Sequence, residues 1–376
     1  LSPPGRNLPT MNMIRSDAPA VWVLIFDRQP AGCEFDRLDL ESTYFEQFLL
    51  QDVRNDFDAN IVLGGDPALL RLSKSMTELE QTASVVRITT DCDDTTATAN
   101  CDGHGMEASM RRCHIPLLTA TELNVQNLTD AKLNSGKSEG LDHAFSANLV
   151  WIEAQVASAK HPATAATQIL NFVLDQLEFN AQHEQKCPVL LATFRRGEDF
   201  TMSEPLTSGV AENSMHVPLW IRPNVGHACR VQAIAGSFDL LPTIATFLGS
   251  ANASVEVRPP DVAQIADLSD RVVTAALLSS DPHCLAFLCG APQVCQDRLL
   301  KLRGDGWIAG RTEEFLLVIS DTNESDADET ESDGDSPEEP SRRLYVKPDD
   351  RFNVHDVSGT YATVVEELSR VLKNLD

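Results

Sequence analysis

Short apolar runs alternate along the chain with longer stretches in which apolar residues recur every three or four positions. Runs of four to eight apolar residues are typical of buried strands, and the longer spacing is typical of helices with one buried face. The runs predict strands at Ala20–Phe26, Ser84–Thr90, Asn148–Ala154, Pro188–Phe194 and Val217–Arg222. The spaced stretches predict helices at Phe35–Leu50, Pro67–Gln81, Thr164–Gln182 and Phe238–Leu248. Strands that alternate with helices indicate an α/β fold, with a mostly parallel sheet covered by helices on both faces.

The pattern changes after about residue 255. Three short runs predict a small antiparallel sheet at Gly306–Thr312, Phe315–Asp321 and Arg342–Pro348, and a terminal amphipathic helix is predicted at Tyr361–Leu375. The segment 321–340 holds ten acidic residues and no basic one, a composition typical of disorder. We therefore expect an α/β core domain over residues 1–255 and a C-terminal subdomain over 256–376 that contains a disordered acidic insertion at 321–340.

The length of the chain indicates how many domains it forms, and its net charge indicates which partners it can bind. The chain has 376 residues, enough for one large domain with a smaller one attached, and 42% of them are hydrophobic. The net charge is −26, and without the ten acidic residues of the insertion it is −26 + 10 = −16. So acidic a protein is not expected to bind nucleic acid or anionic membrane surfaces.

No apolar run approaches the roughly 20 residues that a membrane-spanning helix needs. The early run at Ala20–Phe26 is also too short for the core of a signal peptide. The nine cysteines are irregularly spaced and form no CxxC pair, which favours free thiols in a reducing compartment. A zinc site built from Cys284, Cys289 and Cys295 is the less favoured alternative. We expect a cytoplasmic protein.

Four parts of the sequence, in this order along the chain, carry a resemblance to a known family. They are Val21–Asp27 (VWVLIFD), Phe35–Leu38 (FDRL) with Glu41–Phe48 (ESTYFEQF), Met215–Arg222 (MHVPLWIR) with Ser237–Gly249 (SFDLLPTIATFLG), and Gly310–Thr312 (GRT) with Arg343–Val354 (RLYVKPDDRFNV). Together they resemble the sulfatase family within the alkaline-phosphatase-like superfamily. The resemblance implies a three-layer α/β/α sandwich with a small C-terminal antiparallel β-subdomain and a terminal helix.

The resemblance also implies a nucleophile, which the family forms from the Cys or Ser of a C/S-x-P-x-R motif. The comparable proline here is Pro67, and the alignment puts Gly65 at the nucleophile position and Leu69 at that of the arginine. Asp66 is a replacement candidate, because carboxylates can act covalently. An N-cap role for Asp66 ahead of Pro67 is the favoured interpretation. We predict that the family's nucleophile is lost.

The family's metal site shows a similar loss. Asp27, at the end of the first predicted strand, matches a metal-binding Asp of the family, but Arg195 and Arg196 stand at the positions of two further ligands. Each guanidinium repels a divalent cation, and one carboxylate cannot offset two of them. A Ca²⁺ or Mg²⁺ site of the family type is therefore not expected. We expect either that one of these arginines pairs with Asp27, or that the two bind a sulfate, phosphate or carboxylate.

Other polar positions of the family are also altered. Thr207 stands where the resemblance implies a lysine, and the family's histidine would fall near Glu153 or His161. A surface position is the favoured interpretation for His161, and a structural role is favoured for His216. The predicted remnant of the pocket thus comprises Asp27, Gly65, Arg195, Arg196 and Thr207, with no catalytic residue among them.

Two main hypotheses of function follow, beside a third in which the chain is a regulatory partner of an active homologue. The first is an inactive, sulfatase-like protein that binds a small anion at Arg195 and Arg196 or interacts with a protein partner. The second is a divergent sulfuric or phosphoric ester hydrolase that uses non-standard residues, and it predicts turnover that depends on Asp27. The sequence favours the first.

Overall fold

The computed structural model describes residues 20–33, 35–50, 82–90, 110–111, 114–115, 117–125, 144–183, 187–197, 216–222, 229–248, 299–304, 307–320, 341–347, 349–350 and 353–374. Its larger sheet has eight strands in the order β4-β3-β5-β1-β6-β7-β2-β8. The strands are β1 (Val21–Phe26), β2 (Thr43–Leu49), β3 (Ala83–Thr89), β4 (Leu117–Asn124), β5 (Leu149–Ala154), β6 (Val189–Phe194), β7 (Leu219–Arg222) and β8 (Cys229–Gly236).

Strand β1 lies at the centre of this sheet, between the parallel strands β5 and β6. Every residue of β1, β5 and β6 is buried, which explains why these strands read as unbroken apolar runs in the sequence. Strand β7 is antiparallel to both of its neighbours, β6 and β2, and the other neighbouring pairs of the sheet are parallel. The carboxyl ends of β3, β5, β1 and β6 therefore meet at one edge of the sheet.

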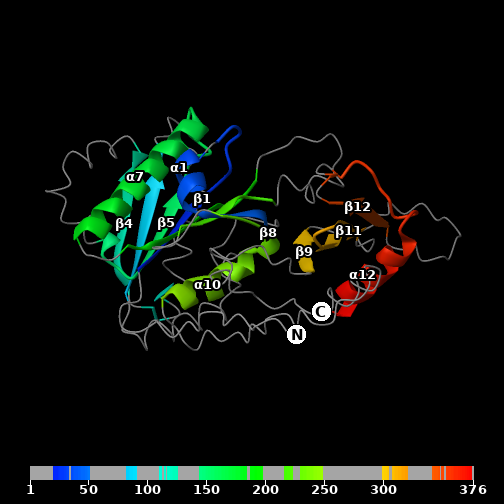
Figure 1. Ribbon diagram of the computed structural model, residues 1–376. Coiled ribbons are helices and arrows are strands. Elements are labelled where there is room, and N and C mark those ends of the chain that lie inside the picture. The colour runs from blue at the N-terminus through cyan, green and yellow to red at the C-terminus, as the bar shows by residue number, and fades with distance from the viewer. Residues whose placement is uncertain are drawn as a thin grey trace, which may run out of the picture.

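Helices cover both faces of the sheet (Figure 1). Helix α7 (Pro162–His183) lies on one face and α10 (Leu240–Phe247), preceded by the short 3₁₀ turn η3 (Ser237–Asp239), lies on the other. The short helix α1 (Asp36–Glu41) adjoins α7, since the Arg37 guanidinium contacts the Asp175 carboxylate at 3.1 Å and that of Glu178 at 2.6 Å. The three-layer sandwich expected from the sequence is confirmed.

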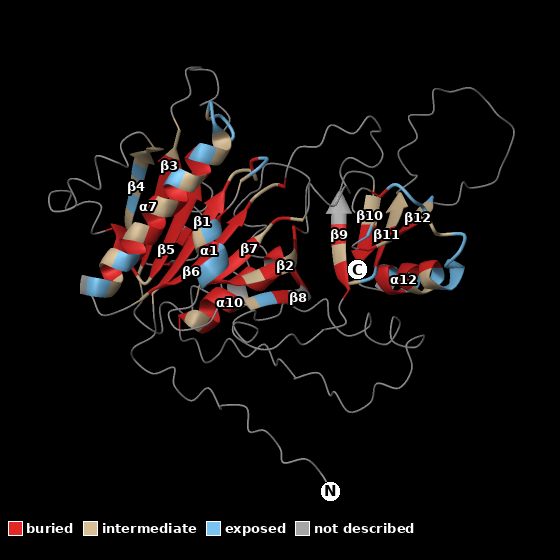
Figure 2. Ribbon diagram, turned by 45° about the horizontal axis from the view of Figure 1, so that its top comes forward, coloured by how far each residue is buried: buried red, intermediate tan, exposed pale blue. Residues whose placement is uncertain are grey.

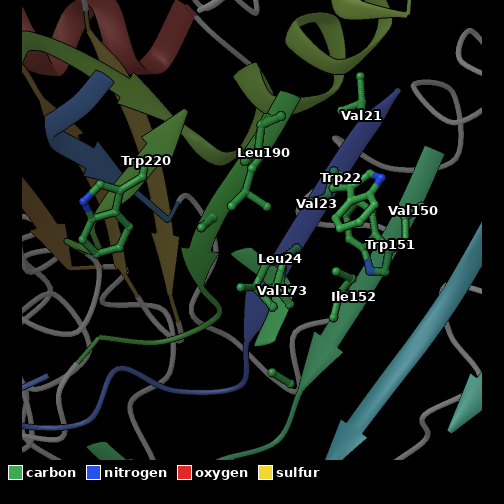
Figure 3. Packing of buried hydrophobic residues seen from close by; sticks show 14 of the residues in the cluster. Val21, Trp22, Val23, Leu24, Val150, Trp151, Ile152, Val173, Leu190 and Trp220 are labelled. Atoms are coloured by element: carbon green, nitrogen blue, oxygen red, sulfur yellow. The ribbon is translucent and has the colours of Figure 1, made fainter. Parts of the chain in front are cut away.

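The side chains of β1 alternate between the two faces. Trp22 faces the side of α7. The centroid of its ring lies 4.7 Å from that of Phe145, and the Phe145 ring in turn contacts Phe172 of α7. Leu24 points the same way and belongs to the same buried cluster as Val173 of α7 (Figure 3). The odd-numbered residues of β1 consequently face the opposite side, toward the layer of α10.

A second sheet of four antiparallel strands follows in the order β12-β11-β10-β9. Its strands are β9 (Leu300–Gly304), β10 (Trp307–Arg311), β11 (Phe315–Ser320) and β12 (Arg342–Val346), and α12 (Ala362–Asn374) packs against them. Leu49 of β2 and Ile234 of β8 share a buried cluster with residues of this smaller sheet. The two sheets thus join at the β8 end of the larger one, as Figure 2 shows.

One predicted helix is wrong. Residues 35–50 form only the six-residue helix α1 before the chain turns into strand β2. The segment after Ser42 holds three aromatic residues, Tyr44, Phe45 and Phe48, and it pairs with β7 and β8, which lie far along the chain. Tertiary pairing therefore overrides the helical spacing. Strands β4, β8 and β9 were not predicted either.

Several expectations lie outside the described residues: the helix at 67–81, the acidic insertion at 321–340 and the domain boundary at residue 255. They remain predictions. None of the helices in the described part of the chain is long and apolar enough to cross a bilayer.

Candidate functional site

The carboxyl edge of the large sheet brings together the segments that follow β5, β1 and β6. The main-chain N–H of Asp27 donates to the carbonyl of Ala154 at 2.9 Å, and that of Arg195 donates to the carbonyl of Phe26 at 2.8 Å. A third bond joins the N–H of Gln29 to the carbonyl of Arg196 at 2.9 Å. The ladder thus continues past the strand ends, which places Asp27 beside the residues that follow both neighbouring strands.

Asp27 is held by main-chain donors. Its Oδ1 accepts the N–H of Val156 at 2.8 Å, and the N–H of Ala157 is shared between Oδ1 at 3.3 Å and Oδ2 at 3.2 Å. Burial raises the pKa of the Asp27 carboxyl above its ordinary value, although these N–H groups and the charge of Arg195 act in the opposite direction. The turn after β5 is therefore tied to the end of β1 through this carboxylate.

Charged residues also line up across the sheet, one level below this edge. Glu153 of β5 is the register partner of Ile25 in β1 and of Arg87 in β3, while Arg87 is also paired in register with Glu122 of β4. Register partners in neighbouring parallel strands point to the same face. Glu153, Arg87 and Glu122 therefore all lie on the face opposite α7.

These side chains form a row of ion pairs. Oε1 of Glu153 lies 2.7 Å from Nη2 of Arg195, and its Oε2 lies 3.4 Å from Nε of Arg87. Nη1 of Arg87 lies 3.9 Å from Oε1 of Glu122. The two middle members are buried, since the side chains of Arg87 and Glu153 are 10% and 11% exposed, whereas those of Arg195 and Glu122 are 25% and 77% exposed. Solvent thus reaches the row at its two ends.

The structure places three of the five predicted pocket residues at this edge: Asp27, Arg195 and Arg196. Gly65 and Thr207 lie outside the described residues. The ion pair of Arg195 is with Glu153, and its charge acts on Asp27 through space. The described partner of Arg195 is therefore Glu153, and the predicted pairing of an arginine with Asp27 stays a prediction.

Two histidines lie in segments that lead into elements next to this edge, His161 ahead of α7 and His216 ahead of β7. His161 is exposed at the start of α7, where its carbonyl accepts the N–H of Ala165. The Nε2 atom of His216 makes a short contact with the carbonyl oxygen of Glu46 in β2, so this ring helps to attach residues 216–222 to β2. Both positions agree with the roles favoured from the sequence.

Arg87 was not among the residues expected at the site, and Glu153 was considered only as the position of a family histidine. A signal was nevertheless present. Each is a charged residue close to the carboxyl end of an otherwise apolar run, VVRIT and VWIEA. A charge inside a strand that is buried on both faces needs a partner, so two such strands predict an ion pair between them.

The donors that the structure describes at this edge do not fit a divalent cation. Ca²⁺ and Mg²⁺ require several oxygen ligands, mostly carboxylates. Among the described residues no cluster of three or more His, Cys, Asp or Glu side chains is arranged to hold a metal ion. The carboxylate of Asp27 already accepts main-chain N–H groups, and Arg195 adds a positive charge close by.

No family model matches the sequence, and a search of curated proteins finds no match either. Solved structures do match. BT33336S-sulf, a glycosaminoglycan-metabolism protein of Bacteroides thetaiotaomicron, has 12% identity and a TM-score of 0.57, with 96% of this chain and 99% of that one covered. The phosphonate monoester hydrolase SpPMH from Silicibacter pomeroyi has 12% identity and a TM-score of 0.51, with 95% and 94% covered.

A protein of the alkaline phosphatase superfamily from Vibrio parahaemolyticus is similar at 11% identity and a TM-score of 0.50, over 96% of this chain and 89% of that one. At such identities the likeness is one of fold. It extends over nearly the whole chain, in agreement with the spread of the sequence resemblance from Val21 to Val354. The chain therefore has the fold that sulfatases share with other proteins of the alkaline-phosphatase superfamily.

Proposed function

We propose that this chain is a sulfatase-like protein that binds a small oxyanion at Arg195 and Arg196 and does not hydrolyse esters by a metal-dependent route. The ligand class is a sulfate, a phosphate or a carboxylate. Guanidinium groups recognise all three through paired N–H donors.

One observation carries the proposal: the carboxyl end of β6 presents cations at the edge where the fold's relatives would need metal-binding carboxylates. In the described part of this edge and the row below it, the cations outnumber the anions by four to three. The cations are Arg28, Arg87, Arg195 and Arg196, and the anions are Asp27, Glu122 and Glu153. A local positive excess in a chain of net charge −26 favours anions over divalent cations as ligands.

The test is titration calorimetry of the full chain with inorganic sulfate, inorganic phosphate and acetate. We expect Arg195→Gln and Arg196→Gln each to weaken binding of the preferred anion by about tenfold, the loss of one charge-assisted contact. Arg230→Gln is the matched control, because that side chain is 71% exposed and lies on β8. Equal affinities for the wild type and both variants would overturn the proposal.

The alternative is a divergent ester hydrolase of sulfate or phosphate esters. The observation in its favour is Asp27, a carboxylate kept at the carboxyl end of the central strand β1 and oriented by two N–H groups. It predicts hydrolysis of aryl sulfates or aryl phosphates that disappears in Asp27→Ala purified in parallel. Turnover lost in that variant would replace the binding proposal.

The proposal also includes a protein partner and a cellular location. The acidic segment 321–340 is a candidate contact for a basic protein partner, because it concentrates ten of the acidic residues. A reducing, cytoplasmic location is supported by the three described cysteines, Cys33, Cys187 and Cys229, which are all free thiols. Co-purification from extracts with and without deletion of 321–340 tests the partner.

A further inference from the structure

Glu153 is the only carboxylate in the described row that lies between two guanidinium groups. It contacts Arg195 with one oxygen, at 2.7 Å, and Arg87 with the other, at 3.4 Å. Its side chain is 11% exposed, so water screens these contacts poorly. A carboxylate in this position affects the charge that Arg195 can present to solvent.

Arg195 is the end of the row at which an anion from solution can arrive. Its side chain is 25% exposed, whereas that of Arg87 is 10% exposed and lies behind Glu153. An incoming sulfate would therefore meet a guanidinium already paired on one side with a protein carboxylate. The ligand and Glu153 share the same cation.

We infer that Glu153 is a positioning residue that sets the anion affinity of Arg195, by holding its guanidinium at the sheet edge and neutralising part of its charge. The inference rests on the proposed binding of an oxyanion at Arg195. Arg87 has the opposite effect, because its positive charge neutralises part of the charge of Glu153 from the other side. The row thus balances the charge that Arg195 presents to an anion.

The charges give two buried variants opposite expected effects. Glu153→Gln keeps the size of the side chain and an oxygen acceptor but removes the negative charge, so sulfate binding should tighten by roughly tenfold. Arg87→Gln removes a positive charge from the far side of Glu153, so sulfate binding at Arg195 should weaken several-fold. A purely structural disturbance would change the affinity in the same direction in both variants.

Glu122→Gln is the matched control. Glu122 belongs to the same row, but its side chain is 77% exposed and its contact with Arg87 is long, at 3.9 Å. Solvent and salt screen such a charge, so its removal should change sulfate affinity by less than about twofold. A second control is Glu153→Gln in an Arg195→Gln background, where the tightening should vanish because the group through which Glu153 acts is absent.

The experiment is a calorimetric titration of the full chain and its variants with inorganic sulfate, repeated with inorganic phosphate. Opposite shifts for Glu153→Gln and Arg87→Gln, with no shift for Glu122→Gln, are the expected result. Shifts in the same direction, or a change of less than twofold for Glu153→Gln, would overturn the inference while the wild type still binds. If neither the wild type nor Glu153→Gln binds either anion, the proposed function fails together with it.

Should Glu153→Gln fold poorly, the double variant Arg87→Gln/Glu153→Gln removes the two opposite charges together. It leaves Arg195 without its neutralising partner and avoids an unpaired charge at Arg87. We expect it to bind sulfate more tightly than Arg87→Gln alone. Equal or weaker binding would contradict the role of Glu153.

Discussion

At the scale of single residues, Asp27 shows how a carboxylate at the end of a strand can hold a neighbouring turn. Its oxygens accept the N–H groups of Val156 and Ala157, which fixes the turn that follows β5 against the end of β1. A buried donor that loses its acceptor costs the full penalty of its burial. Asp27 is therefore a structural residue whatever ligand the edge binds.

Substitutions at Asp27 should separate its hydrogen bonds from its charge. Asp27→Ala leaves the buried N–H of Val156 without an acceptor and should lower the free energy of unfolding by about 1–3 kcal/mol. Asp27→Asn keeps one oxygen, and both N–H groups reach the single atom Oδ1, so near pH 4 its stability should stay close to that of the wild type. Urea unfolding followed by circular dichroism measures both. Equal losses for the two variants would refute this view of the carboxylate.

The charge of Asp27 should affect how the stability of the protein depends on pH. Burial raises the pKa of Asp27, so the folded protein binds this proton more tightly than the unfolded chain, whose value is about 3.9. The contribution of Asp27 to stability is thus complete below about pH 3.9 and is lost as the pH rises through the folded value. Asp27→Asn does not titrate, so its stability relative to the wild type should increase as the pH rises above about pH 4. A constant difference would contradict the raised pKa.

At the scale of elements, the accuracy of the sequence-based prediction depended on where each segment finds its hydrogen-bond partners. The central strands β1, β5 and β6 are buried on both faces, so composition alone identifies them. Strand β2 was predicted as helix because its burial is mixed and its neighbours β7 and β8 lie more than 160 residues away. Local periodicity carries no information about such partners.

The residues of the candidate site also fall into two groups, those whose place the sequence predicts and those whose place depends on distant partners. Asp27, Arg195 and Arg196 follow predicted strands directly, and therefore their place at one edge of a parallel sheet could be expected. The row from Glu122 to Arg195 depends on the order β4-β3-β5-β1-β6 and on the register of each pair. The sequence of a single segment specifies neither the strand order nor the register. For this reason Arg87 could not be predicted to belong to the site.

The packing of α12 on the smaller sheet gives a prediction at this scale. Gly310 of β10 faces the helix, and a Cβ atom added there would lie 3.0 Å from Cδ1 of Leu372 and 3.1 Å from Cδ1 of Leu299. Gly310→Ala should therefore overpack this contact and lower the free energy of unfolding by about 1–3 kcal/mol. In a Leu372→Ala background the same change should cost less, because the two crowding methyl groups of Leu372 are gone and only that of Leu299 remains. Chemical denaturation of the four proteins measures this coupling, and strict additivity would contradict it.

At the scale of the whole molecule, the smaller sheet is joined to the larger one by a buried interface. Leu49 and Ile234 belong to the larger sheet, and they share a cluster with Leu302, Leu316 and Tyr345 of the smaller one. Beside this cluster, Nη2 of the buried Arg311 donates to Oε1 of Gln47 at 3.2 Å. An apolar interface with a buried, hydrogen-bonded cation is expected to unfold together with the sheets that it joins.

Leu49 provides the test of that cooperativity. Leu49→Ala removes a side chain that is 1% exposed and should lower the free energy of unfolding by about 2–5 kcal/mol. The fluorescence of Trp307 reports on the smaller sheet, and its share of the signal follows from comparison with Trp307→Phe, while far-ultraviolet circular dichroism reports mainly on the larger sheet and its helices. If the sheets form one cooperative unit, Leu49→Ala moves both midpoints by the same amount of urea. A Trp307 midpoint that stays in place while the circular dichroism midpoint falls would mean that the smaller sheet folds on its own, and the boundary expected near residue 255 would then separate two independent domains.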